Sequence, residues 1–282
     1  MKLKELYLYG IKKINNNSNE NPELDADLLL SKALNIKFEK VLTCPDEIIA
    51  EDKVKEFNLF LDRRVREEPT AYIVGEKEFY SRKFIVNKSV LIPRPETELL
   101  IESALDKIKN LSDPFVLDIG TGSGCIAIIM ALEKKHSKIV ACDISYEAIK
   151  TACINADLLG AANSIYFVNC DMNKGLRESS FDLIISNPPY VSRDDYNDLP
   201  IGIREFEPEN ALLAGEGGLE YINKIIKVCK HLLNSNGHCI LEIGFDQSRD
   251  SYKLMDLEGF KDISLIKDYS GHERIIVGRW KV

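Results

Sequence analysis

Apolar residues recur with helical spacing in the first part of the chain. In "NPELDADLLLSKALN" this pattern places Leu24, Leu28 and Leu29 on one helix face, and "AEDKVKEFNLFLDRRVREEP" repeats the period. No residue of the segment suggests catalytic chemistry. We therefore expect residues 1–74 to form a small helical domain.

The spacing of apolar residues changes from a helical period to a strand-like alternation at residues 75–92. There "EKEFYSRKFIVNKSVLI" alternates apolar and polar residues around a central turn, which places Phe79, Phe84, Val86 and Val90 on one face. This alternation predicts a β-hairpin that joins the helical domain to the rest of the chain. The next segment, "PRPETELLIESAL", is typical of a helix with proline in its first turn.

Residues 93–282 alternate between apolar strands and amphipathic helices. The expected strands are "PFVLDIG", "SKIVACDIS", "SIYFVNCD", "FDLIISN", "GHCILEIGF", "FKDISLIKD" and "ERIIVGRW". Near-continuous apolar strands separated by helices indicate a parallel sheet covered on both faces. The last two strands, joined by "YSGH", predict an antiparallel hairpin at the sheet edge. The expected fold class is therefore α/β, with a seven-stranded mixed sheet and an N-terminal helical domain.

Composition and charge narrow the range of partners. Apolar residues make up 45% of the chain and charged residues 29%, which is typical of a globular protein. The net charge of −8 argues against tight binding to nucleic acid, which uses clustered Lys and Arg. No apolar run is long enough to cross a bilayer, and the N-terminal segment lacks a signal-peptide core. We expect a cytoplasmic protein without direct nucleic-acid or membrane partners.

Cysteine and histidine positions argue against a disulfide framework and a metal site. The seven cysteines form no Cys-x-x-Cys pair, which fits a reducing compartment. The four histidines lack metal-ligand spacing, so we expect no metal cofactor. Cys125 lies beside a glycine loop and is a candidate nucleophile, but a free cysteine usually behaves as a small buried hydrophobe.

A glycine loop follows the first strand of the α/β region. The sequence "DIGTGSG" carries Gly120, Gly122 and Gly124, which let a backbone turn sharply and approach a ligand closely. The loop is not a P-loop, because no Gly-Lys-Ser/Thr follows. It also departs from the dinucleotide fingerprint, because the third glycine comes two residues after the second.

Acidic residues follow the next two strands. Asp143 ends the second strand, where a carboxylate can accept hydrogen bonds from ribose hydroxyls. Asp171 and Met172 end the third strand and would flank an adenine ring. These strand ends predict an adenosyl ligand without a pyrophosphate, and they resemble S-adenosylmethionine-dependent methyltransferases of the Rossmann-like class. The alternative is a set of turn glycines and capping aspartates in an ordinary α/β protein.

The fourth strand runs into Asn187-Pro188-Pro189-Tyr190. The side-chain carbonyl of Asn187 can accept a hydrogen bond from a substrate N–H, the prolines stiffen the segment, and Tyr190 offers a ring for stacking. A planar nitrogen that carries hydrogens fits this motif, either an amide or the exocyclic amine of adenine. A simple strand-terminating turn would explain the prolines but not the flanking Asn and Tyr.

Four segments resemble one enzyme family over nearly the whole chain: "EEPTAYIVGEKEFYSRKFIVNKSVLIPRPETE", "VLDIGTGSG", "SNPPY" and "REFEPENAL". They are similar to the protein-(glutamine-N5) methyltransferases of bacterial class I peptide chain release factors. The resemblance implies a Rossmann-like class I methyltransferase domain at 93–282, after the helical substrate-recognition domain at 1–74 and the hairpin linker at 75–92. The methyl donor would be S-adenosylmethionine, and the substrate the glutamine of a Gly-Gly-Gln motif.

The resemblance also assigns roles to individual residues. The implied cofactor-binding residues are Gly120, Thr121, Gly122, Ser123, Gly124, Asp143, Met172 and Asn187. The implied substrate-binding residues are Asn187, Pro188, Pro189 and Tyr190, and of these Asn187, Pro188 and Tyr190 would be catalytic. Other family members can have an aromatic residue in place of Met172.

Two further segments and two further functions remain open. Residues 93–98 either wall the site or only start a helix, and "REFEPENALLAGEGG" either shapes the substrate entrance or is a surface loop.

One alternative function is adenine-N6 methylation of DNA or RNA, since a bare Asn-Pro-Pro-Tyr also occurs in the enzymes that catalyse it. The other is a binding subunit without turnover, which the intact glycine loop, Asp143 and Asn187 argue against.

Overall fold

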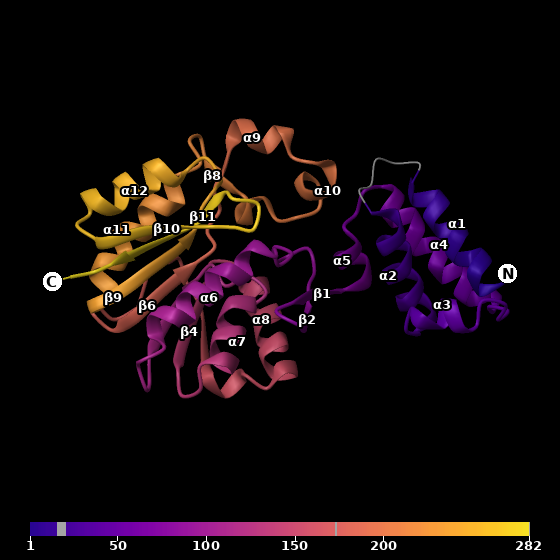
Figure 1. Ribbon diagram of the computed structural model, residues 1–282, viewed down its shortest axis with the longest axis horizontal. Coiled ribbons are helices and arrows are strands. Elements are labelled where there is room, and N and C mark those ends of the chain that lie inside the picture. The colour runs from indigo at the N-terminus through magenta and orange to yellow at the C-terminus, as the bar shows by residue number, and fades with distance from the viewer. Residues whose placement is uncertain (16–20, 173, 282) are drawn as a thin grey trace. The chain divides into compact units, whose positions relative to one another are not determined.

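The computed structural model describes residues 1–15, 21–172 and 174–281. They divide into two compact units (Figure 1). The first unit contains Met1–Glu76 and Pro200–Phe206, and the second contains Lys77–Leu199 and Glu207–Val282.

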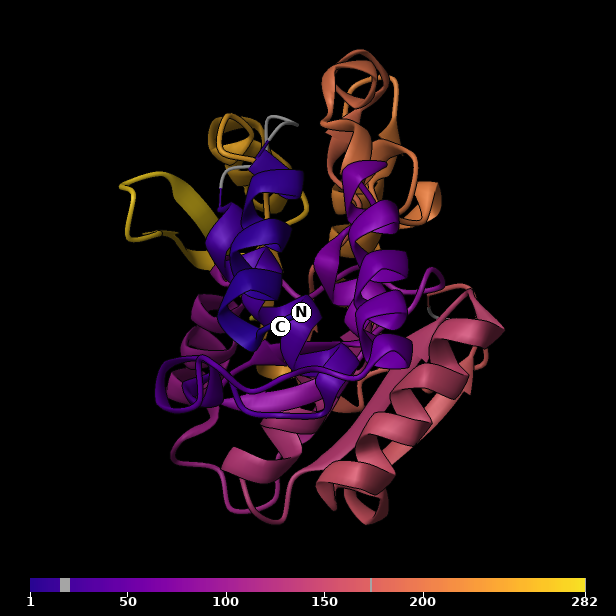
Figure 2. The same cartoon turned by 90° about the vertical axis from the view of Figure 1, so that its right-hand side faces the viewer.

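The first unit is helical. Its helices are α1 (Leu3–Asn15), α2 (Pro22–Leu34), α3 (Glu39–Thr43), α4 (Glu51–Val65), α5 (Thr70–Val74) and α10 (Ile201–Arg204). Helices α1, α2 and α4 pack against one another (Figures 1 and 2). Leu6, Leu29, Phe57 and Leu61 form part of their fully buried core. This packing matters because helices of 13 to 15 residues gain most of their stability from the apolar face that they bury.

The buried face of α2 differs from the expected one. Leu24 is 50% exposed and Leu28 is 41% exposed, so the prediction was wrong for both, whereas Leu29 is fully buried. The residues that face the core are Ala26, Leu29, Leu30 and Ala33. They follow the i, i+3, i+4, i+7 spacing of one helix face. Two of the four residues on this face are alanines, so the positions of the leucines alone did not indicate which face is buried.

A two-stranded sheet starts the second unit. Strands β1 (Glu76–Phe79) and β2 (Arg82–Ile85) are joined by Tyr80 and Ser81, which both have positive φ angles (50° and 57°). Such a two-residue connection matches the twist of a hairpin. Phe79, Phe84, Val86 and Val90 are all buried. The expected hairpin and its apolar face are therefore confirmed.

The main sheet of the second unit has seven strands in the order β10-β11-β9-β6-β3-β4-β5. Their bounds are β3 (Phe115–Ile119), β4 (Lys138–Asp143), β5 (Ile165–Asn169), β6 (Phe181–Ser186), β9 (Leu233–Glu242), β10 (Lys261–Lys267) and β11 (Glu273–Arg279). Strands β9, β6, β3, β4 and β5 are mutually parallel, whereas β11 is antiparallel to both β9 and β10. The expected mixed sheet with an antiparallel last hairpin is confirmed.

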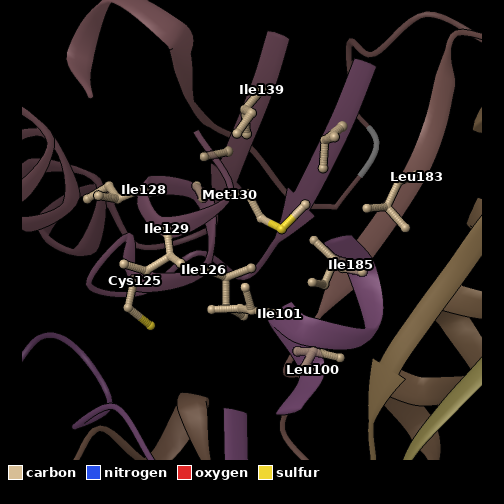
Figure 3. Close-up of a cluster of buried hydrophobic side chains, with 14 of the residues drawn as sticks. Leu100, Ile101, Cys125, Ile126, Ile128, Ile129, Met130, Ile139, Leu183 and Ile185 are labelled. Carbon is tan, nitrogen blue, oxygen red and sulfur yellow. The ribbon is translucent and has the colours of Figure 1, made fainter. Parts of the chain in front are cut away.

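Helices cover both faces of this sheet (Figure 1). Helices α6 (Glu96–Ile108), α7 (Cys125–Glu133) and α8 (Tyr146–Leu159) pack on one face, and α11 (Glu220–Leu232) and α12 (Ser248–Leu257) on the other. Neighbouring strand residues alternate between the two cores: Val116 faces the first and Leu117 the second. Figure 3 shows the first core, where Leu100 and Ile101 of α6 contact the apolar face of α7. Burial on both sides explains the continuous apolar strands.

Several short elements were not expected from the sequence, and neither was α12. They are β7 (Val191–Ser192), α9 (Arg193–Asp198), β8 (Leu213–Gly215) and the 3-10 turns Ala162–Ser164 and Glu209–Ala211. Strands β7 and β8 pair in parallel. Among the described residues, no helix combines the length and apolar character needed to span a membrane.

Candidate active site

A cavity of about 250 Å³ lies at the carboxyl ends of β3, β4, β5 and β6. These four strands are parallel, so the residues that follow them meet at one edge of the sheet. They supply most of the lining: Ile119, Gly120, Thr121, Gly122, Ser123, Cys142, Asp143, Ile144, Ser145, Cys170, Asp171, Met172, Ser186, Asn187, Pro188 and Pro189. The cavity therefore brings the glycine loop, both acidic strand ends and the Asn-Pro-Pro segment together.

The three loop glycines have positive φ angles but face different surroundings. Gly120 (φ 74°) and Gly122 (φ 55°) line the cavity, and a Cβ on either would meet no atom within 4 Å. Gly124 (φ 82°) instead faces α8, where a Cβ would lie 2.9 Å from the Cβ of Ala152. The first two glycines thus leave room for a ligand, and the third allows the loop to approach a helix closely.

Buried polar side chains hold the glycine loop in place. Asn155 on α8 is fully buried and donates to the Ser123 carbonyl (2.8 Å) and the Ile85 carbonyl (3.0 Å), while its own carbonyl accepts from the Ile85 amide (2.7 Å). Thr121 donates to Asp118, also fully buried (2.7 Å). Burial raises the pKa of the Asp118 carboxyl to about 7, against the lowering effect of that hydrogen bond.

Asp143 joins the glycine loop to the second strand end. One carboxylate oxygen accepts from the Gly122 amide (2.9 Å) and the other from the Ser145 amide (2.8 Å). Burial raises the pKa of Asp143, and these backbone amides oppose the shift. Each carboxylate oxygen has a further lone pair, so the side chain can still accept hydrogen bonds from a ligand in the cavity.

Met172 supplies an apolar, polarizable surface at the third strand end. Its backbone has φ 53°, and its carbonyl accepts a hydrogen bond from the thiol of Cys142 (3.3 Å). Asp171, the preceding residue, also lines the cavity and forms an ion pair with Lys174 (3.0 Å). A thioether beside a carboxylate provides both a packing surface and an acceptor for a heteroaromatic ring with an amino group.

Asn187 follows β6 at the cavity wall. Its Nδ2 donates to Thr97 Oγ1 (3.1 Å), and Thr97 Oγ1 donates to Glu242 Oε2 (2.8 Å). The preceding Ser186 donates to the Ile119 carbonyl (2.6 Å), which fixes the end of β6 against β3. The side-chain carbonyl of Asn187 therefore remains available at the cavity.

Tyr190 is anchored behind the wall formed by Pro188 and Pro189. Its hydroxyl donates to Glu242 Oε1 (3.5 Å), and its backbone carbonyl accepts from Gln247 (2.8 Å). Burial raises the pKa of Tyr190 well above its usual value, and the Glu242 charge adds to the shift. Among the described residues, the cavity lining includes neither Tyr190 nor Gly124.

The two segments left open by the sequence both reach the cavity. Pro93, Arg94 and Thr97 line one side, and Asn210 and Ala211 also line it. A largely buried glutamate connects the two segments: Glu207 accepts hydrogen bonds from the Arg94 guanidinium and from the Ile92 amide (3.2 Å). Both segments are thus parts of the site wall.

Sequence reasoning did not single out Thr97, Glu242, Asn155 or Gln247. The glutamate offered a signal, because Glu242 interrupts the apolar strand "CILEIG" at its carboxyl end. A charged residue in a buried strand needs a partner, and that requirement marks a candidate site. Asn155 lies within α8 and Gln247 directly before α12, and no local pattern distinguishes either of them. Among the described residues, no cluster of three or more His, Cys, Asp or Glu side chains is arranged to hold a metal ion.

Comparison with known proteins places the chain among methyltransferases. Residues 95–236 match the family model "Methyltransferase small domain", and residues 5–75 match "PrmC N-terminal domain". A solved methyltransferase from Pyrococcus furiosus shares the fold, with a TM-score of 0.52 and 19% identity over 78% of this chain and 99% of that one.

Two curated relatives are more similar in sequence. "Release factor glutamine methyltransferase" from Rhodopirellula baltica is 40% identical, and the match covers 91% of this chain and 89% of the relative. "Bifunctional methyltransferase" from Rickettsia typhi is 38% identical over 95% of this chain, which spans 57% of that longer relative. The glycine loop, the Asn-Pro-Pro-Tyr segment and these matches over nearly the full chain agree, and the chain belongs to the family of release factor glutamine methyltransferases.

Proposed function

We propose that this protein transfers the methyl group of S-adenosylmethionine to the side-chain amide nitrogen (N5) of the glutamine in the Gly-Gly-Gln motif of class I peptide chain release factors. The observation that carries the proposal is the orientation of Asn187. Its amide nitrogen is engaged by Thr97, so its carbonyl oxygen is left to accept from a substrate N–H beside the glycine loop.

The cavity residues fit an adenosyl cofactor. Gly120, Thr121, Gly122 and Ser123 would hold its amino-acid part beside the start of α7. Gly124 would set the loop against α8, Asp143 would accept from the ribose hydroxyls, and Met172 would pack on the adenine ring. The bound cofactor supplies an electrophilic methyl group on a sulfonium.

The substrate amide would be held by the segment Asn187 to Tyr190. Asn187 Oδ1 and the Pro188 carbonyl would each accept one hydrogen of the glutamine –NH2, while Pro189 fixes the backbone and the Tyr190 ring flanks the amide plane. These acceptors aim the nitrogen lone pair and stabilise positive charge as it develops on nitrogen. The methylated amide nitrogen is strongly acidic, so it can lose its proton to water without a general base.

The first unit would contribute to recognition of the protein substrate. We assign residues 1–74 to substrate recognition, 75–92 to the linking hairpin and 93–282 to methyl transfer. The match of residues 5–75 to the PrmC N-terminal domain supports this division. A Gly-Gly-Gln tip suits the site because glycines let a backbone enter where side chains would be blocked. The setting would be the cytoplasm, where release factors act, without a metal, a membrane or direct nucleic-acid contact.

Adenine-N6 methylation is the less favoured alternative. The Asn-Pro-Pro-Tyr segment suits an exocyclic amine as well as an amide. The net charge of −8 and the sequence match to a release factor enzyme over most of both chains favour the protein substrate.

One assay distinguishes the candidate substrates. The protein is incubated with labelled S-adenosylmethionine, an unmodified class I release factor and an adenine-containing oligonucleotide, with and without EDTA. We expect label on the release factor alone, unaffected by EDTA and lost in Asn187→Ala, which should weaken cofactor binding only modestly. Label on the oligonucleotide would establish the alternative, and label on neither with intact cofactor binding would indicate a binding subunit.

A further inference from the structure

A chain of hydrogen bonds connects Asn187 to two buried residues. It runs from Asn187 Nδ2 to Thr97 Oγ1 (3.1 Å) and from Thr97 Oγ1 to Glu242 Oε2 (2.8 Å). Thr97 is 2% exposed and Glu242 is 1% exposed, so solvent does not substitute for either partner. Thr97 is on α6 and Glu242 ends β9, which means that two separate elements hold one side chain of β6.

The order of donors along this chain fixes which end of the Asn187 amide faces the cavity. A carboxylate only accepts hydrogen bonds, so ionised Glu242 takes the single hydroxyl hydrogen of Thr97. The Thr97 oxygen then has only lone pairs to offer, and it must accept from Asn187 Nδ2. Asn187 Oδ1 is consequently the end left for a ligand, and an amide flip would set two acceptors against each other.

We propose that Thr97 and Glu242 are positioning residues that hold the carbonyl end of Asn187 toward the substrate, and so select a nitrogen that donates hydrogens. The proposal rests on the proposed function for the identity of that nitrogen. Thr97 lines the cavity and Glu242 does not, and we assign neither of them a hydrogen bond to the substrate. Their effect passes through Asn187, whose carbonyl would be replaced by an –NH2 group in the flipped state.

The same carboxylate also contacts Tyr190, the last residue of the Asn-Pro-Pro-Tyr segment. Glu242 Oε1 accepts a hydrogen bond from the Tyr190 hydroxyl at 3.5 Å, while Oε2 accepts from the Thr97 hydroxyl. One buried group therefore links the first and last residues of the Asn-Pro-Pro-Tyr segment. A local change at Glu242 is expected to disturb both of them together.

The protonation state of Glu242 can reverse the order of donors. Burial raises the pKa of its carboxyl to about 7. A protonated Glu242 can donate to Thr97 Oγ1, which frees the Thr97 hydrogen for Asn187 Oδ1 and allows the amide to flip. The charged or titratable groups that face Glu242 are Glu96 on α6, Arg274 on β11, Tyr190 and Cys125 on α7. Deprotonated Glu242 is thus the form that presents the Asn187 carbonyl.

The test combines variants with a readout that does not depend on turnover. Thr97→Val removes both hydrogen bonds at nearly constant shape, Thr97→Ser restores them, and Glu242→Gln removes the titration. The ¹⁵N-labelled protein reports the Asn187 side-chain –NH2 signal as a function of pH, assigned by its loss in Asn187→Ala. Methylation of an unmodified release factor gives kcat, calorimetry gives the Kd of S-adenosylmethionine, and thermal unfolding checks the fold.

We expect the Asn187 signal of the wild type to shift with a midpoint near pH 7, and to lose this shift in Thr97→Val and Glu242→Gln. Thr97→Val should lower kcat by about 10- to 100-fold, as for a misplaced positioning group, with an unchanged cofactor Kd. Thr97→Ser should recover kcat to within about threefold. The kcat of the wild type should fall below pH 7, and that of Glu242→Gln should not.

Either of two results would overturn the proposal: an Asn187 side-chain signal of the wild type that does not change with pH, or a folded Thr97→Val variant with the kcat of the wild type. The wild-type titration needs no variant, so a misfolded Thr97→Val would not prevent a decision. If the wild type methylates no release factor, the proposed function fails, while the Asn187 titration still decides whether Thr97 and Glu242 orient that side chain.

Discussion

The side-chain amide of Gln247 donates to the backbone carbonyl of Tyr190 at 2.8 Å, from a residue next to the start of α12. The same nitrogen donates to the Gly218 carbonyl (3.1 Å), and the Gln247 carbonyl accepts from the Gly244 amide (2.9 Å). Gln247 thus ties two backbone sites, at Gly218 and Gly244, to the end of the Asn-Pro-Pro-Tyr motif. The bond to the Tyr190 carbonyl fixes the backbone position from which the Tyr190 side chain extends.

Gln247→Met should therefore lower both the kcat of methylation and the free energy of unfolding. Methionine has a similar length but leaves two carbonyls and one amide without their partner, which costs about 1 to 3 kcal/mol in free energy of unfolding. We expect kcat for release factor methylation to fall while the Kd of S-adenosylmethionine stays close to the wild-type value. Lys253→Met on the exposed side of α12 is the matched control and should leave both kcat and the free energy of unfolding close to their wild-type values. Equal effects of the two substitutions would contradict this role for Gln247.

Gly124→Ala should destabilise the protein more than alanine at another glycine with positive φ. Both Gly124 (φ 82°) and Gly271 (φ 88°) would force alanine into the left-handed region, at a cost of about 1 to 2 kcal/mol. Only at Gly124 would the new Cβ also meet the Cβ of Ala152 at 2.9 Å, whereas nothing lies within 4 Å at Gly271. We expect urea unfolding to give a loss of about 2 to 4 kcal/mol for Gly124→Ala, and a loss near the lower figure for Gly271→Ala.

Gly122→Ala should lower the affinity for the cofactor more than it lowers the stability of the fold. Its Cβ would point into open cavity space, so strain at φ 55° is the main cost to the fold. The added methyl group would instead occupy the space assigned to the cofactor. Calorimetry should show a larger loss of affinity for S-adenosylmethionine than expected from the change in unfolding free energy. Wild-type cofactor affinity in a folded Gly122→Ala variant would argue against ligand binding at this loop.

Asn155→Ala should couple a loss of stability to weaker cofactor binding. The substitution removes the partners of the Ile85 amide and carbonyl and of the Ser123 carbonyl, all at a fully buried position. Unsatisfied buried groups of this kind cost about 1 to 3 kcal/mol each. Because Ser123 belongs to the glycine loop, the Kd of S-adenosylmethionine should rise as well. Asn58→Ala, which removes one hydrogen bond within α4 (2.9 Å), is the control for asparagine loss and should leave cofactor binding intact.

The free energy of unfolding should fall as pH rises from about 4 to 7. Burial raises the pKa of Asp118 and of Glu242 to about 7, above their usual values of 3.8 and 4.5. The folded state therefore holds protons that the unfolded state has already released, so this contribution is full below pH 4 and is lost through pH 7. The loss is on the order of 4 kcal/mol for Asp118 and 3 kcal/mol for Glu242. Urea unfolding across this range should show a slope reduced by up to one proton in Asp118→Asn, and an unchanged slope would contradict the assignment.

Local sequence patterns determined the order of elements and the chemistry at the strand ends. Near neighbours in the chain were enough to predict the seven strands, the hairpin residues Phe79 and Phe84, and the sites after β3, β4 and β6. Burial on two faces leaves a continuous apolar run, and prolines, which lack a backbone N–H donor, mark where a strand ends. The buried face of α2 did not follow, because Ala26 and Ala33 contact the core only where neighbouring helices come close.

The tertiary structure alone decided how the site is held. Thr97 and Glu242 are 145 residues apart, and Ile85 and Asn155 are 70 apart, yet each pair is joined by a hydrogen bond to a buried side chain. No periodicity encodes such pairs, since a hydrogen bond depends on the final positions of two side chains and not on their spacing in sequence. The sequence thus identified the groups that face the ligand, and folding selected the residues that orient them.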